Sequence, residues 1–391
     1  MIPYYFDWAA TSPMSERSIQ AYVETARNYR GNPSALHKDG VAAAKALHAE
    51  RERTARLLKV SPKEIIYTSG ATESNAIILQ SLLWRPNPGR VVLSAIEHDS
   101  VLQYRRILES HGYEVELVRA PGGYVDPESL AQALNETTQM VCIMLVNNVL
   151  GTVQDMSELT RVIRNHEQRY GRRVHVHCDA VQAPGKIPFN LGSLGVDSAS
   201  FSAHKFQGPK GTGFLYLRSE SWEPLSRGGG QERGIRPGTE HLAAIVAMNI
   251  ALEEAVLTEG ESLEQGALLR RLFEKSIAEE GSLVKLISPP FTSFHQCTPF
   301  IFTCVVPHIP SEVFTRIMYD KGFCISSGSA CSNNASKGSN DLLTGAGIAS
   351  TDAGSAVRIS FGADTDEHQI RLLAETMIRE ARKMSSLMRK R

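Results

Sequence analysis

Short apolar segments and longer amphipathic segments alternate along most of this chain. Val91–Ala95 and Met140–Val146 have the length and composition of buried strands, and stretches with helical spacing follow them, as in Ser157–Arg169. Repeated strand–helix units are typical of a parallel sheet covered by helices. The pattern therefore predicts an α/β fold with a mostly parallel sheet and helices on both faces.

The pattern changes in the last third of the chain. Helices are expected at Leu263–Ala278 and Ser311–Lys321, with short apolar strands between and after them. This order predicts a smaller α+β C-terminal domain. We expect residues 14–258 to form a large domain, and residues 1–13 and 259–391 to form the small one.

Lys205 lies in a polar turn between two apolar strands, Ala199–Ala203 and Phe214–Leu217. A lysine at the point where buried strands leave a core is partly desolvated and loses its proton easily. The neutral amine can form a Schiff base with a carbonyl compound, so Lys205 is a candidate nucleophile. The alternative is an ordinary solvated loop lysine, and this stretch alone does not decide between them.

Polar residues also follow other predicted strands. The strand that ends at Thr68 leads through Gly70 into an apolar helix, and such a turn exposes backbone N–H groups that bind phosphate. A capped turn without a ligand is the alternative. Asp179 ends another strand, where a buried acid requires a partner. His175 and His177 precede it on one face, but no third ligand has compatible spacing, so we expect no metal site.

Three features downstream point to chemistry. Residues 227–239 combine three arginines with successive glycines, which suits an anion or a close subunit contact better than a linker. Cys331 lies in a run of small polar residues that is expected to be exposed and mobile, where reactivity explains a cysteine better than packing. Arg358 lies within an apolar strand, and a buried guanidinium requires a carboxylate, which a substrate could supply.

Composition and charge exclude several classes of protein. The 391 residues include 42 Lys and Arg against 42 Asp and Glu, so the formal net charge is zero and there is no field to attract nucleic acid or an acidic membrane. No apolar run approaches a membrane span and no signal pattern begins the chain, which predicts a cytoplasmic protein. The six cysteines form no Cys-x-x-Cys pair, so neither a zinc site nor a disulfide framework is expected.

A Schiff-base lysine, a strand-end acid and a phosphate site are together what pyridoxal phosphate requires. The chain also resembles the cysteine desulfurases, within the class with the longer cysteine loop. The matching motifs follow in order over nearly the whole chain: Thr68–Asn75, Glu97-His98, Val146–Asn148, Asp179–Gln182, Ser202–Lys205 with Gly208–Gly211, Gly228–Gly234 and Ser326–Cys331. The resemblance implies a fold type I pyridoxal phosphate enzyme, usually a homodimer. Such an enzyme converts L-cysteine to L-alanine and leaves a persulfide for a sulfur acceptor such as an iron–sulfur scaffold.

The resemblance also implies a role for each matching residue. Lys205 would hold the cofactor and move the Cα proton, His98 would stack on the ring, and Cys331 would attack the substrate sulfur. Arg358, with Asn148, would bind the substrate carboxylate. The other cofactor contacts would come from Asp179 at the ring nitrogen, Gln182 and Asn148 at the ring hydroxyl, and Ala71, Thr72, Ser202, His204 and the partner subunit's Thr239 at the phosphate.

The chain departs from the family pattern at Val149, Gln207 and Pro237, none of which removes a group that the chemistry requires. Residues 332–347 lack the family's proline-containing pattern, which leaves the sulfur acceptor open. A selenocysteine lyase or a fold type I aminotransferase would use the same lysine and aspartate without needing Cys331. A catalytically idle cofactor-binding protein is a further alternative, and the complete set of catalytic residues argues against it.

Overall fold

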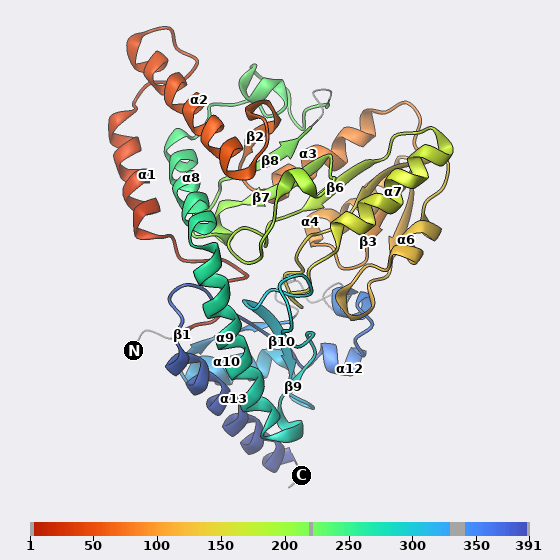
Figure 1. The fold of residues 1–391 in the computed structure, drawn as a ribbon, viewed down its shortest axis with the longest axis vertical. Helices are drawn as coiled ribbons and strands as arrows, with labels where there is room; N and C mark the ends of the chain where they lie inside the picture. Colours follow the sequence, from red (N-terminus) through yellow and green to blue (C-terminus); the bar gives the residue numbers. More distant parts are fainter. Residues whose placement is uncertain (1–3, 219–221, 329–340, 389–391) are drawn as a thin grey trace.

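The computed structural model describes residues 4–218, 222–328 and 341–388. Its upper half in Figure 1 contains a seven-stranded sheet in the order β2-β8-β7-β6-β5-β3-β4. β8 is antiparallel to both of its neighbours and all other pairs are parallel, as the sequence pattern predicts for most of the sheet. The strands are β2 (Ile65–Thr68), β3 (Arg90–Ser94), β4 (Glu114–Val118), β5 (Thr138–Cys142), β6 (His175–Asp179), β7 (Ser198–Ser202) and β8 (Gly213–Leu217).

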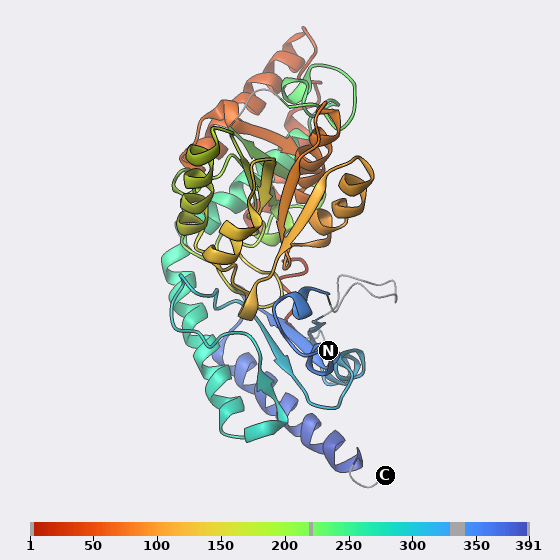
Figure 2. The ribbon, with the colours of Figure 1, turned by 90° about the vertical axis from the view of Figure 1, so that its right-hand side faces the viewer.

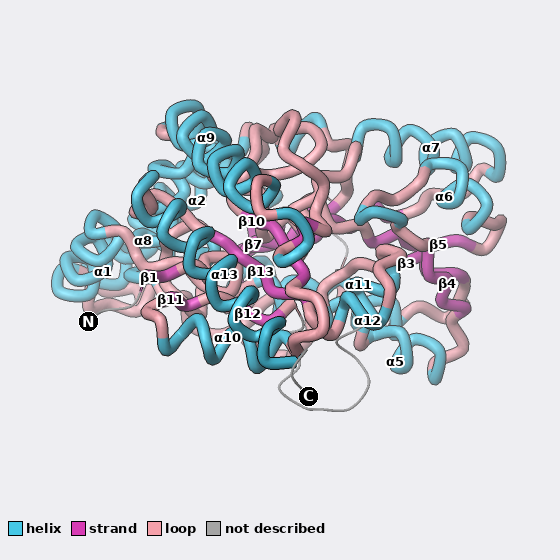
Figure 3. Tube along the Cα trace, turned by 90° about the horizontal axis from the view of Figure 1, so that it is seen from below, coloured by secondary structure: helices cyan, strands magenta, loops and turns pink. Residues whose placement is uncertain are grey.

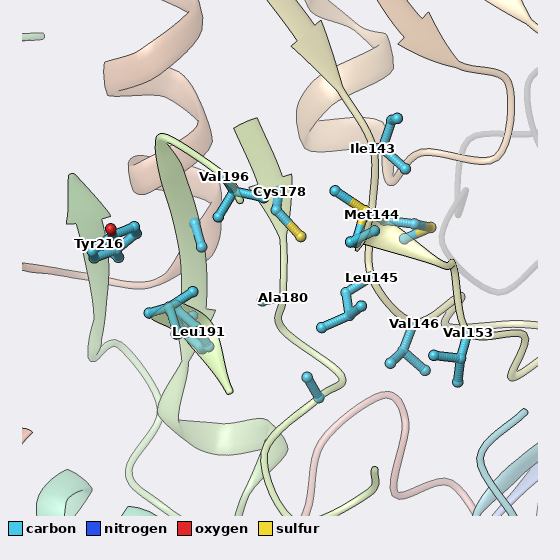
Figure 4. Packing of buried hydrophobic residues seen from close by; sticks show 14 of the residues in the cluster. Ile143, Met144, Leu145, Val146, Val153, Cys178, Ala180, Leu191, Val196 and Tyr216 are labelled. Atoms are coloured by element: carbon cyan, nitrogen blue, oxygen red, sulfur yellow. The ribbon is translucent and has the colours of Figure 1, made fainter. Parts of the chain in front are cut away.

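Hydrophobic clusters cover both faces of this sheet. Side chains alternate along a strand, so Val91 and Leu93 of β3 pack on one face, against α3 and α5, while Val92 packs on the other, with α2, α7 and α8. Figure 4 shows part of the second cluster, which includes Cys178 and Tyr216. The helices are α1 (Glu16–Asn28), α2 (Lys38–Leu58), α3 (Ala71–Ser81), α4 (Asp99–Leu102), α5 (Tyr104–Ser110), α6 (Pro127–Ala133), α7 (Met156–Tyr170) and α8 (Leu242–Leu257).

A smaller antiparallel sheet lies in the lower half, in the order β12-β13-β10-β9. Seen from below, the three long helices α9, α10 and α13 lie across it, and α9 runs along the outside of this half (Figures 2 and 3). Phe273 of α9, Phe302 of β10 and Phe314 of α10 share its core. These elements are α9 (Glu259–Ala278), β9 (Lys285–Leu286), β10 (Ile301–Val305), α10 (Ser311–Asp320), β12 (Ser326–Ser327), α11 (Asp341–Gly345), α12 (Ser350–Ala353), β13 (Ala356–Ser360) and α13 (Glu367–Met388).

Two halves with separate sheets agree with the expected α/β class and its smaller α+β part. Only Thr258 separates α8 from α9, so the chain passes from one half to the other along two successive helices. The exact division into residues 14–258 on one side and 1–13 with 259–391 on the other stays a prediction.

The strand expected at Met140–Val146 is shorter in the structure, because β5 ends at Cys142. Ile143 and Leu145 still donate to carbonyls of β6, but Met144 N donates to the carboxylate of Glu97, at 2.6 Å, instead of to a neighbouring strand. The chain therefore leaves β3 here and carries Asn148 toward the edge of the sheet where β6 and β7 also end.

The N-terminal segment has a larger part in the fold than its sequence indicates. Tyr4–Tyr5 forms β1, which pairs in parallel with β11 (Phe323–Cys324), and Asp7 bridges to Ser360 at the end of β13. Ser12 N then donates to the carbonyl of His204, at 2.8 Å. Residues 4–12 thus join the small half of the molecule to the turn that carries Lys205.

Candidate active site

A cavity of about 380 Å³ lies at the carboxyl ends of the parallel strands, beside Arg358 of β13. This is where open α/β sheets bind their ligands. Among the predicted site residues, the cavity brings together Ala71, Thr72, His98, Asn148, Asp179, Gln182, Ser202, His204, Lys205 and Arg358. Thr239 does not line it, and Cys331 lies outside the described residues.

Lys205 ends a single 3-10 turn (Ala203–Lys205) that follows β7. Its Nζ donates to the carbonyl oxygens of Ala9 and Ala10, at 2.6 and 2.8 Å. The turn is tight, since Gln207 has a φ of 65° and a Cβ on Gly208 would lie 2.8 Å from that of Ala203. The amine is therefore held at the cavity by two carbonyls that sequence reasoning missed, because nothing in the composition of residues 9–10 indicates a contact so distant in the chain.

Asp179 is oriented by two donors. The Val181 N–H donates to its Oδ1, at 3.1 Å, and Asn75 Nδ2 donates to its Oδ2, at 3.3 Å. Asn75 Oδ1 in turn lies 2.9 Å from Nε2 of the buried His177. Burial lowers the pKa of His177 to about 3, so this ring is neutral and its Nε2–H donates to Asn75. Sequence reasoning did not identify Asn75 as an orienting residue, although it lies in the second turn of α3.

His175 and His177 both contact Ser198. Both rings lie 2.7 Å from the hydroxyl of Ser198, and burial lowers the pKa of His175 as well to about 3. The ranges that the structure describes contain no group of three or more His, Cys, Asp or Glu residues that could hold a metal ion.

The N-terminus of α3 lies where the sequence predicts a phosphate site. Gly70 has a φ of 140°, and Ala71 N donates to Ser202 Oγ, at 2.8 Å, which ties the helix to the end of β7. An adjoining cavity of about 350 Å³ is lined by Thr72, His204 and other residues. Burial, and next the charge of Lys205, lower the pKa of His204 to about 4. A neutral imidazole, a hydroxyl and helix N–H groups can therefore all face an anion here.

Several buried polar atoms around the main cavity have no hydrogen-bond partner among the described residues. They are Asn148 Oδ1, Gln182 Oε1 and Arg358 Nε. Burying such atoms unpaired is costly, so they indicate a ligand that pairs with them. A hydroxyl can donate to one of the two amide oxygens and a carboxylate can accept from the guanidinium. With Lys205 for an aldehyde and Asp179 for a ring nitrogen, the residues present fit pyridoxal phosphate and an amino acid.

Arg358 already has one carboxylate partner. Its Nη2 lies 2.7 Å from Asp7 Oδ1, and its Nη1 donates to the carbonyl of Asn148, at 3.1 Å. Only 3% of Arg358 is exposed. The sequence predicted a carboxylate for this buried guanidinium but did not identify Asp7, which lies at the other end of the chain.

The glycine-rich loop is anchored by an ion pair outside the cavity. Arg51 binds the carboxylate of Glu232 with both terminal nitrogens, and Tyr67 N donates to the same carboxylate, at 2.8 Å. Glu232 and Arg233 both have positive φ, so the anchored loop turns sharply. Thr239 is exposed beyond this turn. Its contact with a phosphate in the partner subunit stays a prediction.

Glu97 lies beside His98 in the interior. Its Oε1 accepts from Ser94 Oγ and from Met144 N, at 2.5 and 2.6 Å, and its Oε2 is buried without a partner among the described residues. Burial raises the pKa of Glu97 to about 8. A carboxyl group with this pKa is protonated at neutral pH. The uncharged Glu97 side chain therefore connects the segment that carries His98 to the end of β5 through its hydrogen bond with Met144 N.

Replacing Glu97 by glutamine is expected to remove a pH dependence of stability. Because the folded pKa lies above the unfolded value, the folded state holds the extra proton, and wild-type stability falls as pH rises toward 8. Glutamine mimics the neutral acid, so its stability relative to wild type should improve by about 2 kcal/mol between pH 6 and 8.5. Denaturant unfolding at both pH values measures this, with exposed Glu264→Gln as control. A difference that stays constant with pH would show that Glu97 ionises normally.

The comparisons with known proteins agree with this geometry. The aminotransferase class-V family model matches residues 4–373. "Cysteine desulfurase IscS" of Dictyoglomus turgidum is 32% identical, over 98% of this chain and 95% of its own. A "NifS/IcsS protein homolog" of Lactobacillus delbrueckii is 37% identical, over 91% of both chains. A solved structure described as a NifS-like protein superposes with a TM-score of 0.88 at 32% identity, covering 97% of this chain and 99% of that one.

The match extends through both halves of the fold and includes every part of the chain that lines the cavity. Pyridoxal phosphate is the cofactor of this family, and the polar groups described above fit it. The chain belongs to the aminotransferase class-V family and, within it, to the cysteine desulfurases.

Proposed function

We propose that this enzyme converts L-cysteine to L-alanine and transfers the sulfur to its own Cys331. The observation that carries the proposal is the cavity itself, in which an amine, an acid, a helix N-terminus and a buried guanidinium converge. Pyridoxal phosphate, when bound, supplies an electron sink for bond changes at the substrate's Cα and Cβ. A buried guanidinium suits the carboxylate of an amino acid substrate.

Each residue then has a task set by its position. Asp179, fixed by Asn75 and Val181 N, stays oriented to pair with a protonated ring nitrogen. Lys205 Nζ accepts the Cα proton once it is free of the cofactor, and it returns a proton to the product. Arg358 holds the substrate carboxylate and shares its charge with Asp7. His98, whose Nδ1 lies 2.9 Å from Ser100 Oγ, has a fixed ring orientation at the cavity.

Thiol acidity supports Cys331 as the sulfur acceptor. The chain has six cysteines, and burial raises the pKa of each of the five described ones, Cys142, Cys178, Cys297, Cys304 and Cys324. A raised pKa disfavours the thiolate, which is the nucleophile. None of these five is suited to the attack, whereas the polar sequence around Cys331 is.

The transfer balances without an external oxidant. The Cys331 thiolate attacks the substrate sulfur, an S–S bond forms and the C–S bond breaks. The carbon fragment keeps the electron pair of that bond and takes up a proton to become alanine. One L-cysteine and one protein thiol therefore give one L-alanine and one persulfide.

The proposal also covers the location of the enzyme, its oligomeric state and the acceptor of its sulfur. We place the enzyme in the cytoplasm as a homodimer, in which Thr239 reaches a phosphate in the partner subunit. The persulfide would pass to an acceptor such as an iron–sulfur scaffold protein. No helix in the described ranges has the length and apolar character needed to cross a membrane.

The proposal is tested by incubating the purified enzyme, loaded with pyridoxal phosphate, with L-cysteine. Without reductant, we expect one equivalent of alanine per subunit and a mass increase of one sulfur on the peptide containing Cys331. With dithiothreitol, alanine and sulfide should form continuously in equal amounts. Transfer of the amino group to a keto acid would instead support an aminotransferase. Turnover of selenocysteine with no reaction of cysteine would support a selenocysteine lyase.

A further inference from the structure

Lys186 is a buried lysine that the proposed reaction does not use. Only 6% of it is exposed, and its Nζ donates to the backbone carbonyl of Lys205, at 2.5 Å. It follows Gly185, whose φ of 69° lets the chain turn where a Cβ would lie 3.1 Å from that of Ala255. Its own carbonyl accepts from Thr298 Oγ1, at 2.8 Å. Lys186 therefore contacts the turn of the cofactor lysine from behind, while being held from both halves of the molecule.

The carbonyl that Lys186 binds lies outside the regular bonds of its turn. Ala203 O accepts from both Phe206 N and Gly208 N, and these two bonds close the turn around Lys205. The Lys205 carbonyl points away from them, toward Lys186. A donor at this carbonyl fixes the peptide plane that follows Lys205, and with it the direction in which the Lys205 side chain leaves the backbone.

The charge of Lys186 is not neutralised nearby. No Asp or Glu in the described ranges forms an ion pair with its amine. Burial, and next the charge of Lys205, lower the pKa of Lys186 to about 7. The interaction is mutual, since each ammonium disfavours the other, and His204 experiences both charges in the same direction. At pH 7.5 an amine with this pKa is largely neutral, and a neutral amine can still donate to the Lys205 carbonyl.

We propose that Lys186 is a positioning residue for Lys205, which fixes the Lys205 backbone through its carbonyl. The proposal rests on the proposed role of Lys205 as the residue that holds pyridoxal phosphate. Attachment there is a condensation, in which the neutral amine forms a C=N bond with the cofactor aldehyde and one water leaves. A fixed Lys205 backbone favours this step, because the amine then has a constant position at the cavity.

Removing the amine should leave the fold intact. Lys186 and Lys205 both line a second cavity of about 330 Å³, which is also lined by Trp8, Phe300 and Phe361. Water in this cavity can hydrogen-bond to the Lys205 carbonyl after a substitution, so the carbonyl is not left unpaired. The expected defect is thus in the placement of Lys205 rather than in folding.

The test compares Lys186→Met and Lys186→Gln with wild type and with Lys45→Met, an exposed lysine of α2. Apoenzyme is mixed with pyridoxal phosphate at pH 7.5, samples are reduced with borohydride at intervals, and the label on the Lys205 peptide is measured by mass spectrometry. Labelling of Lys186→Met should be about ten-fold slower than wild type. Lys186→Gln keeps a donor without the charge and should fall between them, while Lys45→Met should match wild type.

The outcomes separate this inference from the proposed function. Equal labelling rates in wild type and Lys186→Met, with unchanged circular dichroism, would overturn the role of Lys186 and leave Lys205 as the cofactor residue. Wild-type label on a residue other than Lys205 would overturn the proposed site itself. Because Lys186→Gln introduces a polar side chain of similar length, it provides the same comparison if the methionine variant does not fold.

Discussion

Lys205→Ala is expected to lower alanine formation from L-cysteine at least ~10³-fold, because the reaction loses both its cofactor attachment and its proton carrier. No other described lysine takes its place, since the amine of the nearby Lys186 donates to the Lys205 carbonyl. The amine of Lys205 is held at the cavity by Ala9 O and Ala10 O, so the substitution removes the amine that these two carbonyls hold there. Alanine is measured by amino acid analysis in excess cofactor.

Lys45→Ala is the matched control for this variant, because it removes a lysine from the exposed side of α2. Its rate should equal that of wild type. Borohydride reduction adds an independent measurement, since Lys205→Ala should give no labelled peptide from this segment. If Lys205→Ala formed alanine at a rate close to that of wild type in excess pyridoxal phosphate, Lys205 would be excluded as the proton carrier.

Cys331→Ser is expected to lower sulfide formation at least ~100-fold while cofactor binding stays normal. A serine hydroxyl is not ionised at neutral pH and is a poor nucleophile toward sulfur. None of the polar groups that line the cavity changes in this variant, so L-cysteine should still alter the absorbance of the bound cofactor. Sulfide is measured with dithiothreitol present, and cofactor content by absorbance.

Cys324→Ser is the appropriate control because Cys324 is the least buried of the described cysteines. Burial, and next Asp7, raise the pKa of its thiol, so it should not contribute to sulfur transfer. Sulfide formation should be unchanged. If Cys331→Ser kept its activity and Cys324→Ser lost it, the acceptor thiol would be on β11 beside the N-terminal strand.

The sequence predicted the parts of the site that arise from local order. Asp179 ends a buried strand, Lys205 lies in the turn between two strands and Ala71 lies in the turn predicted before a helix, so each position depends on its own neighbours. The helix itself begins at Ala71 rather than at the predicted Asn75. Their convergence then follows from the parallel sheet, which places the carboxyl ends of its strands at one edge. This is why one cavity contains so many of the predicted residues.

The contacts that the sequence did not predict connect distant segments. The Asp7–Arg358 pair, the carbonyls of Ala9 and Ala10 at Lys205, and the Glu97 bond to Met144 N depend on tertiary structure. A sequence does not indicate which main-chain carbonyls make such contacts, since every residue has one. The early end of β5 has the same origin, because a side chain from another strand end takes the Met144 N–H. No local sequence pattern predicts these contacts, because they form only when the chain folds.

The Asp7–Arg358 pair also constrains when the site can form during protein synthesis. Asp7 leaves the ribosome first and Arg358 near the end, whereas the strands of the large sheet all lie before residue 218. Domains generally fold in the order of synthesis, so the large sheet can assemble while the guanidinium that binds Asp7 does not yet exist. Until β13 is made, residues 7–10 lack their contacts with Arg358 and Ser360. We therefore expect Lys205 to bind the cofactor only after the whole chain has been synthesised. A chain that is truncated or stalled before β13 is expected to bind little pyridoxal phosphate.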